Sequence, residues 1–186
     1  LDYDRERAAR EVRLRGLPEA FARMFLEGRS LFRARKAEAS FFRYGWDELI
    51  LSARDLAVQC VPQDQGHFLQ VTRLALRLFD YLRPLHGRGD EDRVLLQLAA
   101  LLHDIGWADG QRGHHKSSMR RILGASELPL QRKERWLVAL IARYHRRALP
   151  KDKHPIFSEL DVEDRRRVSE LACLLRIADG LDYSHD

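Results

Sequence analysis

The stretch that decides the fold is residues 94–107, VLLQLAALLHDIGW. Apolar residues lie on every side of the predicted helix, which is typical of a helix in a protein interior. This helix runs into two adjacent ionisable residues, His103 and Asp104. An imidazole and a carboxylate are costly to bury unless a partner satisfies them. Because both groups are common metal ligands, the stretch favours a buried helix that leads to a metal site.

The composition fits one globular domain. The chain has 186 residues and 45% hydrophobic content, which is sufficient for a substantial core. Its longest apolar run, around residues 98–102, is too short to span a membrane, and no signal-peptide pattern is present. Cys60 and Cys173 lie far apart in apolar helical surroundings. We therefore expect buried, reduced thiols and a cytoplasmic location.

The net charge is +5, from 33 Lys plus Arg against 28 Asp plus Glu. This balance attracts anions weakly and is not a nucleic-acid signature by itself. Basic and aromatic residues do not interleave, so a nucleic-acid partner is not expected. An Arg-rich RNA- or DNA-binding adaptor stays an alternative, and it predicts binding that weakens strongly with salt.

Apolar residues recur at helical spacing along most of the chain, and no segment has the pattern of a strand. The fold class that we predict is all-α, a helical bundle. Besides the central helix, the expected helices cover residues 48–60, 66–83, 115–123, 131–144 and 162–179. The expected loops are residues 86–90, 108–114 and 148–155, which are polar, basic or rich in glycine. His86 and His154 fall in such loops, so we expect them at the surface.

Residues 1–50 are expected to form a separate N-terminal helical extension, and residues 51–186 the main domain. Residues 1–15 are dense in charge, and Pro18 stands at a plausible first helical position. Residues 31–44 carry three phenylalanines. These helices could cap the main domain or pair two copies into a homodimer.

Four ionisable residues continue the apolar stripes of the predicted helices. They are His67, His103, His145 and Asp179, and each lies four residues from an apolar member of its stripe. Residues three and four apart share a helix face, so all four side chains should point inward. A single inward histidine is more often a hydrogen-bonded core residue than a ligand. Three inward histidines and Asp179, together with Asp104, favour a metal centre.

These residues carry a resemblance to a known family. His67, the pair His103 and Asp104, and Asp179 match the H…HD…D pattern of the HD-domain metal-dependent phosphohydrolases. The stretches LAALLHDIGW, GHHKSS, ALIARYHRRALP and RIADGLDYSH resemble the C-terminal HD-like domain of the exopolyphosphatase / guanosine pentaphosphate phosphohydrolase (Ppx/GppA) family. The resemblance covers about residues 52–185, and it implies that residues 51–186 form an HD-domain helical bundle.

The resemblance also implies one or two divalent metal ions, which could be Mn, Fe, Ni, Co, Zn or Mg. The ligands of a first ion would be His67, His103, Asp104 and Asp179. A second ion would share Asp104 and add His145 together with His115 or its neighbour His114.

The function that this ligand set implies is hydrolysis of a phosphate ester or anhydride bond. The substrate would be a nucleotide or another phosphorylated small molecule, attacked by a metal-bound hydroxide. Asp104 is the central catalytic candidate because both ions would share it. Basic residues flank the ligands and could bind substrate phosphates; they are Lys116, Arg143, Arg146 and Arg147.

Other functions stay open at this point. Larger family members carry two actin-like domains that perform the polyphosphate chemistry, and these 186 residues contain no counterpart, so we expect no exopolyphosphatase activity by that route. The main alternative is a non-catalytic module that binds an anionic regulator, such as polyphosphate or a guanosine polyphosphate, or that mediates dimerisation. A further alternative is other HD chemistry, including di-iron oxygenation.

One substrate is disfavoured. Guanosine tetraphosphate hydrolases of the HD superfamily resemble one another in an acidic pair shortly after the HD motif. Here the corresponding positions hold Gly106, Trp107 and Ala108, and Asp109 is the only nearby acid.

Overall fold

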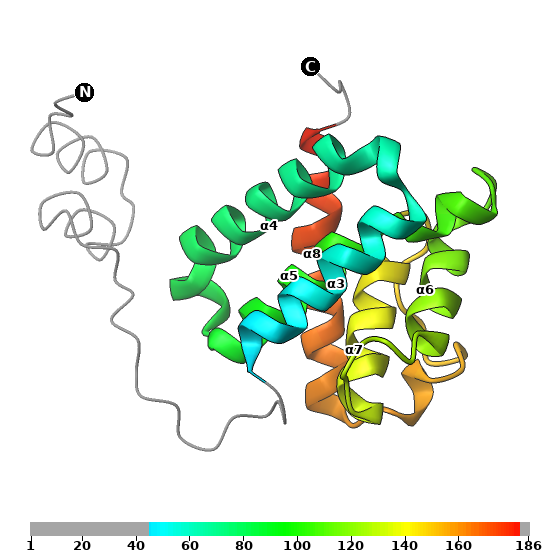
Figure 1. The fold of residues 1–186 in the computed structure, drawn as a ribbon. Helices are drawn as coiled ribbons and strands as arrows, with labels where there is room; N and C mark the ends of the chain where they lie inside the picture. The colour runs from blue at the N-terminus through cyan, green and yellow to red at the C-terminus, as the bar shows by residue number, and fades with distance from the viewer. Residues whose placement is uncertain (1–44, 183–186) are drawn as a thin grey trace, which may run out of the picture. The chain divides into compact units, whose positions relative to one another are not determined.

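The computed structural model describes residues 45–182, and this part of the chain contains six α-helices and no strand (Figure 1). The predicted all-α fold class is confirmed. The α-helices are α3 (Trp46–Cys60), α4 (Gln65–His86), α5 (Asp90–Leu102), α6 (His114–Gly124), α7 (Arg132–Arg143) and α8 (Val162–Leu181). Three short 3-10 helices are η1 (Pro62–Asp64), η2 (Ile105–Asp109) and η3 (Phe157–Glu159). The predicted helices within residues 1–44, and any dimer that they form, lie outside the described residues.

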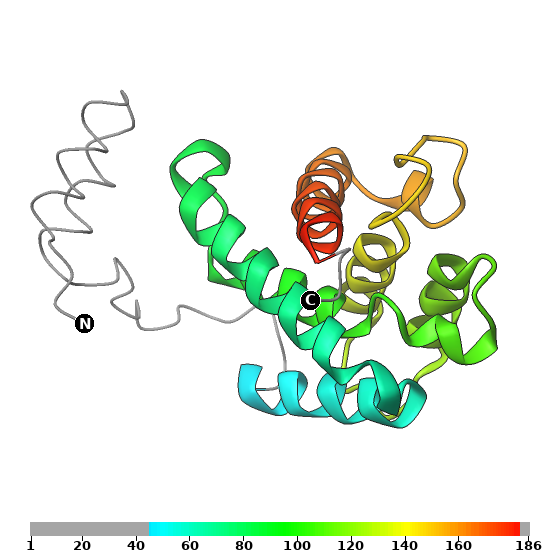
Figure 2. The ribbon, with the colours of Figure 1, turned by 90° about the horizontal axis from the view of Figure 1, so that it is seen from above.

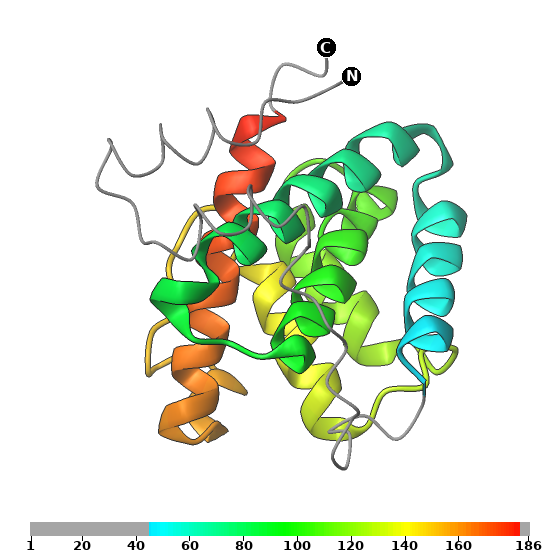
Figure 3. The same cartoon turned by 90° about the vertical axis from the view of Figure 1, so that its left-hand side faces the viewer.

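Helix α5 is the centre of the bundle. It packs against α3, α4, α7 and α8, and Figures 2 and 3 show α3 and α8 on opposite sides with α4 and α5 between them. A helix that is surrounded in this way has no solvent-facing stripe. This explains why only Gln97 interrupts the apolar run from Val94 to Leu102. Each fully buried leucine of this run stabilises the fold by roughly 1.5–3 kcal/mol.

Carboxylates fix the beginning of three helices. At the start of α5 and of α7, Asp92 and Glu134 accept hydrogen bonds from backbone N–H groups three residues earlier, at 3.3 and 2.6 Å. At α8, Asp161 accepts a bond of 2.8 Å from the N–H of Asp164. Such bonds satisfy N–H groups that a helix start leaves free, and the negative charge suits the helix dipole. The acidic first turn of α5 explains why this helix begins at Asp90, inside the loop expected over residues 86–90.

Some expectations about exposure are wrong. Cys173 is exposed and Cys60 only half-buried. Cys173 lies between buried neighbours on α8, but one residue corresponds to about 100° of helix rotation, which turns it outward. His86 is the last residue of α4 and is half-buried, because its Nε2–H donates to the Phe79 carbonyl at 2.9 Å. His154 is also half-buried, with Nδ1 2.7 Å from the Tyr144 hydroxyl.

No helix within the described range is both long and apolar enough to cross a lipid bilayer.

Candidate metal centre

Two imidazoles and two carboxylates meet beyond the carboxyl end of α5. The Nε2 atom of His67 lies 3.6 Å from Asp104 Oδ2 and 3.4 Å from Asp179 Oδ1. The Nε2 atom of His103 lies 3.5 and 3.6 Å from the same two oxygens, and 3.3 Å from His67 Nε2. Atoms that sit about 2.1 Å from a tetrahedral ion are about 3.4 Å apart. The spacing of these four atoms therefore fits a single metal ion.

A second group uses the other oxygen of the same carboxylate. Asp104 Oδ1 lies 3.3 Å from His114 Nε2 and 3.5 Å from His145 Nε2. Both Asp104 Oδ1 and His114 Nε2 are buried, and neither has a hydrogen-bond partner within residues 45–182. Buried polar atoms are rarely left without a partner because desolvation then goes uncompensated. A cation would satisfy both, so the residues present fit a second ion beside the first.

Helix ends orient two of the imidazoles. The Nδ1–H of His103 donates to the carbonyl of Ala100 at 2.7 Å, and the Nδ1–H of His145 donates to that of Ala142 at 2.6 Å. Both carbonyls belong to the last turn of a helix, where the backbone leaves carbonyl groups free. With the proton held on Nδ1, the lone pair of Nε2 points into the site, which is the tautomer that a metal ligand needs.

The other two imidazoles are held in the same way. The Nδ1–H of His114 donates to the Gln111 carbonyl at 3.0 Å. The Nδ1–H of His67 donates to the carboxylate of Asp182 at 2.8 Å. Asp182 did not emerge from the sequence, although it directly follows the last residue of α8 and lies only three residues after Asp179. All four imidazoles thus present Nε2 to the site.

The charges of the site favour a cation. Burial disfavours the ionised form of Asp104 and Asp179, but the imidazoles of His103 and His67 outweigh it and hold both pKa values well below their usual range. Burial would also lower the pKa of His67, yet hydrogen bonds with Asp104, Asp179 and Asp182 raise it to about 11. Without a metal, the carboxylates hold a proton on His67. A divalent ion would compete with that proton for the same atoms.

Of the two adjacent histidines at the start of α6, His114 belongs to the second group. His115 is buried but belongs to neither group. Its burial, and then the neighbouring His114, lower the pKa of His115 to about 4. The sequence left the choice between these neighbours open.

Gly106 sets the distance between η2 and α6. Its N–H donates to Ser118 Oγ at 2.9 Å, and an added Cβ would lie 2.2 Å from the carbonyl oxygen of His114. A side chain at this position would therefore push apart the two segments that bring Asp104 and His114 together. The sequence pattern contained no sign of this close approach.

A cleft of about 660 Å³ lies over the site, and His67, Asp104 and Asp179 are among the residues that line it. Arg146, one of the predicted phosphate-binding residues, lines this cleft as well. Lys116 and Arg143 do not. Lys116 is exposed on α6, and the guanidinium of Arg143 lies 5.5 Å from the ring centre of Tyr144.

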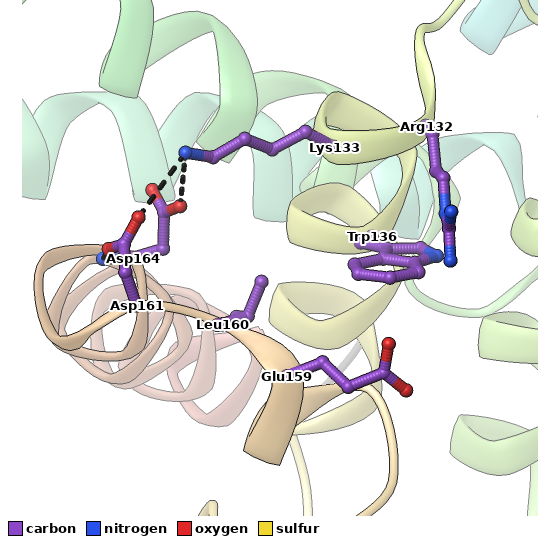
Figure 4. Close-up of a pocket in the computed structure, with 7 residues that line it drawn as sticks. All are labelled: Arg132, Lys133, Trp136, Glu159, Leu160, Asp161 and Asp164. Atoms are coloured by element: carbon purple, nitrogen blue, oxygen red, sulfur yellow. Dashed lines mark hydrogen bonds and ion pairs between the residues drawn. The ribbon is translucent and has the colours of Figure 1, made fainter.

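Figure 4 shows a second cavity, of about 500 Å³, between the start of α7 and the start of α8. Lys133 Nζ lies 2.6 Å from Asp164 Oδ2 and 3.5 Å from Asp161 Oδ2. Arg132 stacks over the ring of Trp136, 4.4 Å from its centre. Since the lysine is already paired with carboxylates, this cavity is a poorer candidate for a reaction site than the cleft beside Asp104.

Comparisons with known proteins identify the family of this chain. Residues 56–185 match the family described as Ppx/GppA phosphatase, domain III. No curated protein matches the chain. The family match covers well over half of the sequence and includes each residue of both ligand groups. The chain therefore belongs to the Ppx/GppA phosphatase domain III family.

Proposed function

We propose that this protein is a metal-dependent phosphohydrolase of the HD superfamily, which cleaves a phosphate ester or anhydride bond of a nucleotide or another phosphorylated small molecule. The observation that carries the proposal is the Asp104 carboxylate, whose two oxygens face two separate groups of imidazoles. Two-metal hydrolases need such a shared ligand because their ions lie about 3.5–4 Å apart.

The ligands of the first ion would be His67, His103, Asp104 and Asp179. Those of the second would be Asp104, His114 and His145. A set of imidazoles and carboxylates without thiolate suits Mn, Fe, Ni, Co, Zn or Mg. When bound, the ions would supply a hydroxide nucleophile at neutral pH and stabilise charge at phosphorus.

The residues of the chain position this chemistry. The Nδ1–H groups of the four imidazoles donate to three backbone carbonyls and one carboxylate, which keeps each ring in place. The carbonyls are those of Ala100, Ala142 and Gln111, and the carboxylate is that of Asp182. Arg146 at the cleft would bind a phosphate oxygen by a charge-assisted hydrogen bond.

The test begins with the metal content of the full-length protein, measured by elemental mass spectrometry after growth with added Mn or Fe. We compare wild type, Asp104→Ala and the matched control Asp109→Ala. Asp109 lies close in sequence but pairs with Arg121 at the surface. We expect about one to two equivalents in wild type and in the control, and loss in Asp104→Ala.

Wild type and Asp109→Ala should also hydrolyse p-nitrophenyl phosphate after metal loading, and Asp104→Ala should not. Circular dichroism checks that the wild-type protein has its normal helical fold. If the protein is normally helical and still holds no metal, the proposal is refuted.

The match to domain III favours a second function, because the polyphosphate chemistry of larger members resides in their actin-like domains. The protein would then be a non-catalytic module that binds an anionic regulator. This function predicts that the metal-loaded protein does not hydrolyse p-nitrophenyl phosphate but binds tripolyphosphate in calorimetry.

A further inference from the structure

We propose that the cleft takes a substrate with a single phosphate group, a phosphomonoester of a neutral polar molecule, and not a polyphosphate chain or a guanosine polyphosphate. This inference rests on the proposed phosphohydrolase function and narrows its substrate.

The charge of the cleft is the first argument. Among the described residues that line it, Arg146 is the only arginine or lysine, and the carboxylates are Asp64, Asp104 and Asp179. Two divalent ions and Arg146 would bring five positive charges, against these three carboxylates and that of Asp182, which contacts His67. The surplus is small, and a metal-bound hydroxide would reduce it further. The dianion of a phosphomonoester therefore exceeds this surplus by less than a chain of several phosphates does.

The other cations near the ligands in sequence are not among the residues that line the cleft; they are Lys116, Arg143 and Arg147. Lys133, at the second cavity, is paired with Asp164. A polyphosphate needs a track of basic side chains along its length, because each phosphate carries its own charge. Within residues 45–182 the cleft offers Arg146 alone.

The remaining lining residues suit a neutral polar group. Gln63 and Gln111 line the cleft, and each amide can both donate and accept hydrogen bonds, as sugar hydroxyls and base edges require. The ring of Trp107 adds an apolar wall, which is fixed by stacking on His114 at 5.0 Å between ring centres. The cleft volume of about 660 Å³ falls within the usual range for small-molecule sites. A nucleoside monophosphate or a sugar phosphate has this combination.

The experiment uses the full-length, Mn-loaded protein. We compare kcat/KM for adenosine monophosphate and glucose 6-phosphate with that for tripolyphosphate and guanosine tetraphosphate. Free Mn²⁺ is held constant, because phosphate chains chelate it. Calorimetric binding of adenosine monophosphate and of tripolyphosphate provides a readout that is independent of turnover. We expect the monoesters to be preferred by roughly tenfold or more in both measurements. The reason is that each additional phosphate of a chain would find no cationic side chain to make a charge-assisted hydrogen bond with it.

Two variants locate the contact. Arg146→Ala should weaken adenosine monophosphate binding by roughly tenfold. Arg132→Ala, which removes a cation of the second cavity, should leave that binding unchanged. An effect of Arg132→Ala instead of Arg146→Ala would overturn the assignment of the cleft.

A preference for tripolyphosphate or guanosine tetraphosphate would overturn the inference and leave the phosphohydrolase proposal standing. If no compound is hydrolysed, the phosphohydrolase proposal fails. The inference about its substrate, which rests on that function, then fails with it.

Discussion

Replacing Gly106 with alanine should separate ligands of the second group. The added Cβ would lie 2.2 Å from the carbonyl oxygen of His114 and 2.4 Å from the backbone nitrogen of Ser118, whereas ordinary contacts begin at 3.4 Å. Both atoms belong to the backbone of α6, so rotation of a side chain cannot relieve the clash. Either α6 or η2 has to move by about 1 Å to reach ordinary contact distances.

Movement of α6 and movement of η2 would each displace a metal ligand. Helix α6 carries His114, and η2 directly follows Asp104. Metal–ligand distances tolerate only about 0.2 Å, so a shift of about 1 Å takes at least one ligand out of reach. Overpacking of this kind costs about 3 kcal/mol. For a chain of this size, that corresponds to a decrease in Tm of roughly 6–12 °C.

The assay compares metal content and thermal unfolding of wild type, Gly106→Ala and Gly124→Ala. Gly124 lies on the same helix, but an added Cβ there would have no atom within 4 Å. The control should keep its metal and its Tm, or gain slightly in Tm, because alanine favours a helix more than glycine does. Wild-type metal content and Tm in Gly106→Ala would refute the role that we give to this close approach.

Three other predictions address the surroundings of the site. Asp182→Asn should weaken Mn²⁺ binding by about 10–100-fold in a calorimetric titration, since it disturbs the partner that orients His67; unchanged affinity would argue against that role. Arg135→Ala should lower the free energy of unfolding by about 2 kcal/mol in urea, because the guanidinium donates to the carbonyls of Ile122 and Leu128, at 3.0 and 2.7 Å, and so holds the α6–α7 connection. A loss near zero would show that water replaces these bonds. In metal-free protein, the carboxylates raise the pKa of His67 from 6.5 to about 11, so the stability that its proton provides is complete below pH 6.5 and declines as the pH rises toward 11. His67→Gln should remove this decline from a series of Tm values across that range, and an identical decline in the variant would contradict the assignment.

The sequence was sufficient to predict the parts of the site that follow from helical periodicity. His67, His103 and Asp179 extend apolar stripes of α4, α5 and α8, and stripes on packed helices face one core. The structure brings these three together with Asp104. The same periodicity predicted the central helix, because an apolar run without a polar stripe has to be buried.

The remaining features depend on tertiary packing. His114 and His115 open α6, and no apolar stripe precedes them to show which one points inward. Asp182 contacts His67, which lies 115 positions earlier in the chain. Arg146 lines the cleft and Lys116 does not, although both lie near ligands in the sequence. The direction of the loop or helix that carries each cation decides this.

The shared carboxylate of Asp104 has a thermodynamic consequence. Its two oxygens belong to one rigid planar group, so a torsion that aligns Oδ2 with one pair of imidazoles also fixes Oδ1 opposite the other pair. A metal ion bound at either group of ligands would restrict that torsion. This would lower the entropic cost of binding an ion at the other group. The like charges of two ions would oppose this effect. By linkage the net coupling is reciprocal, so an ion in either position changes the affinity of the other position by the same factor.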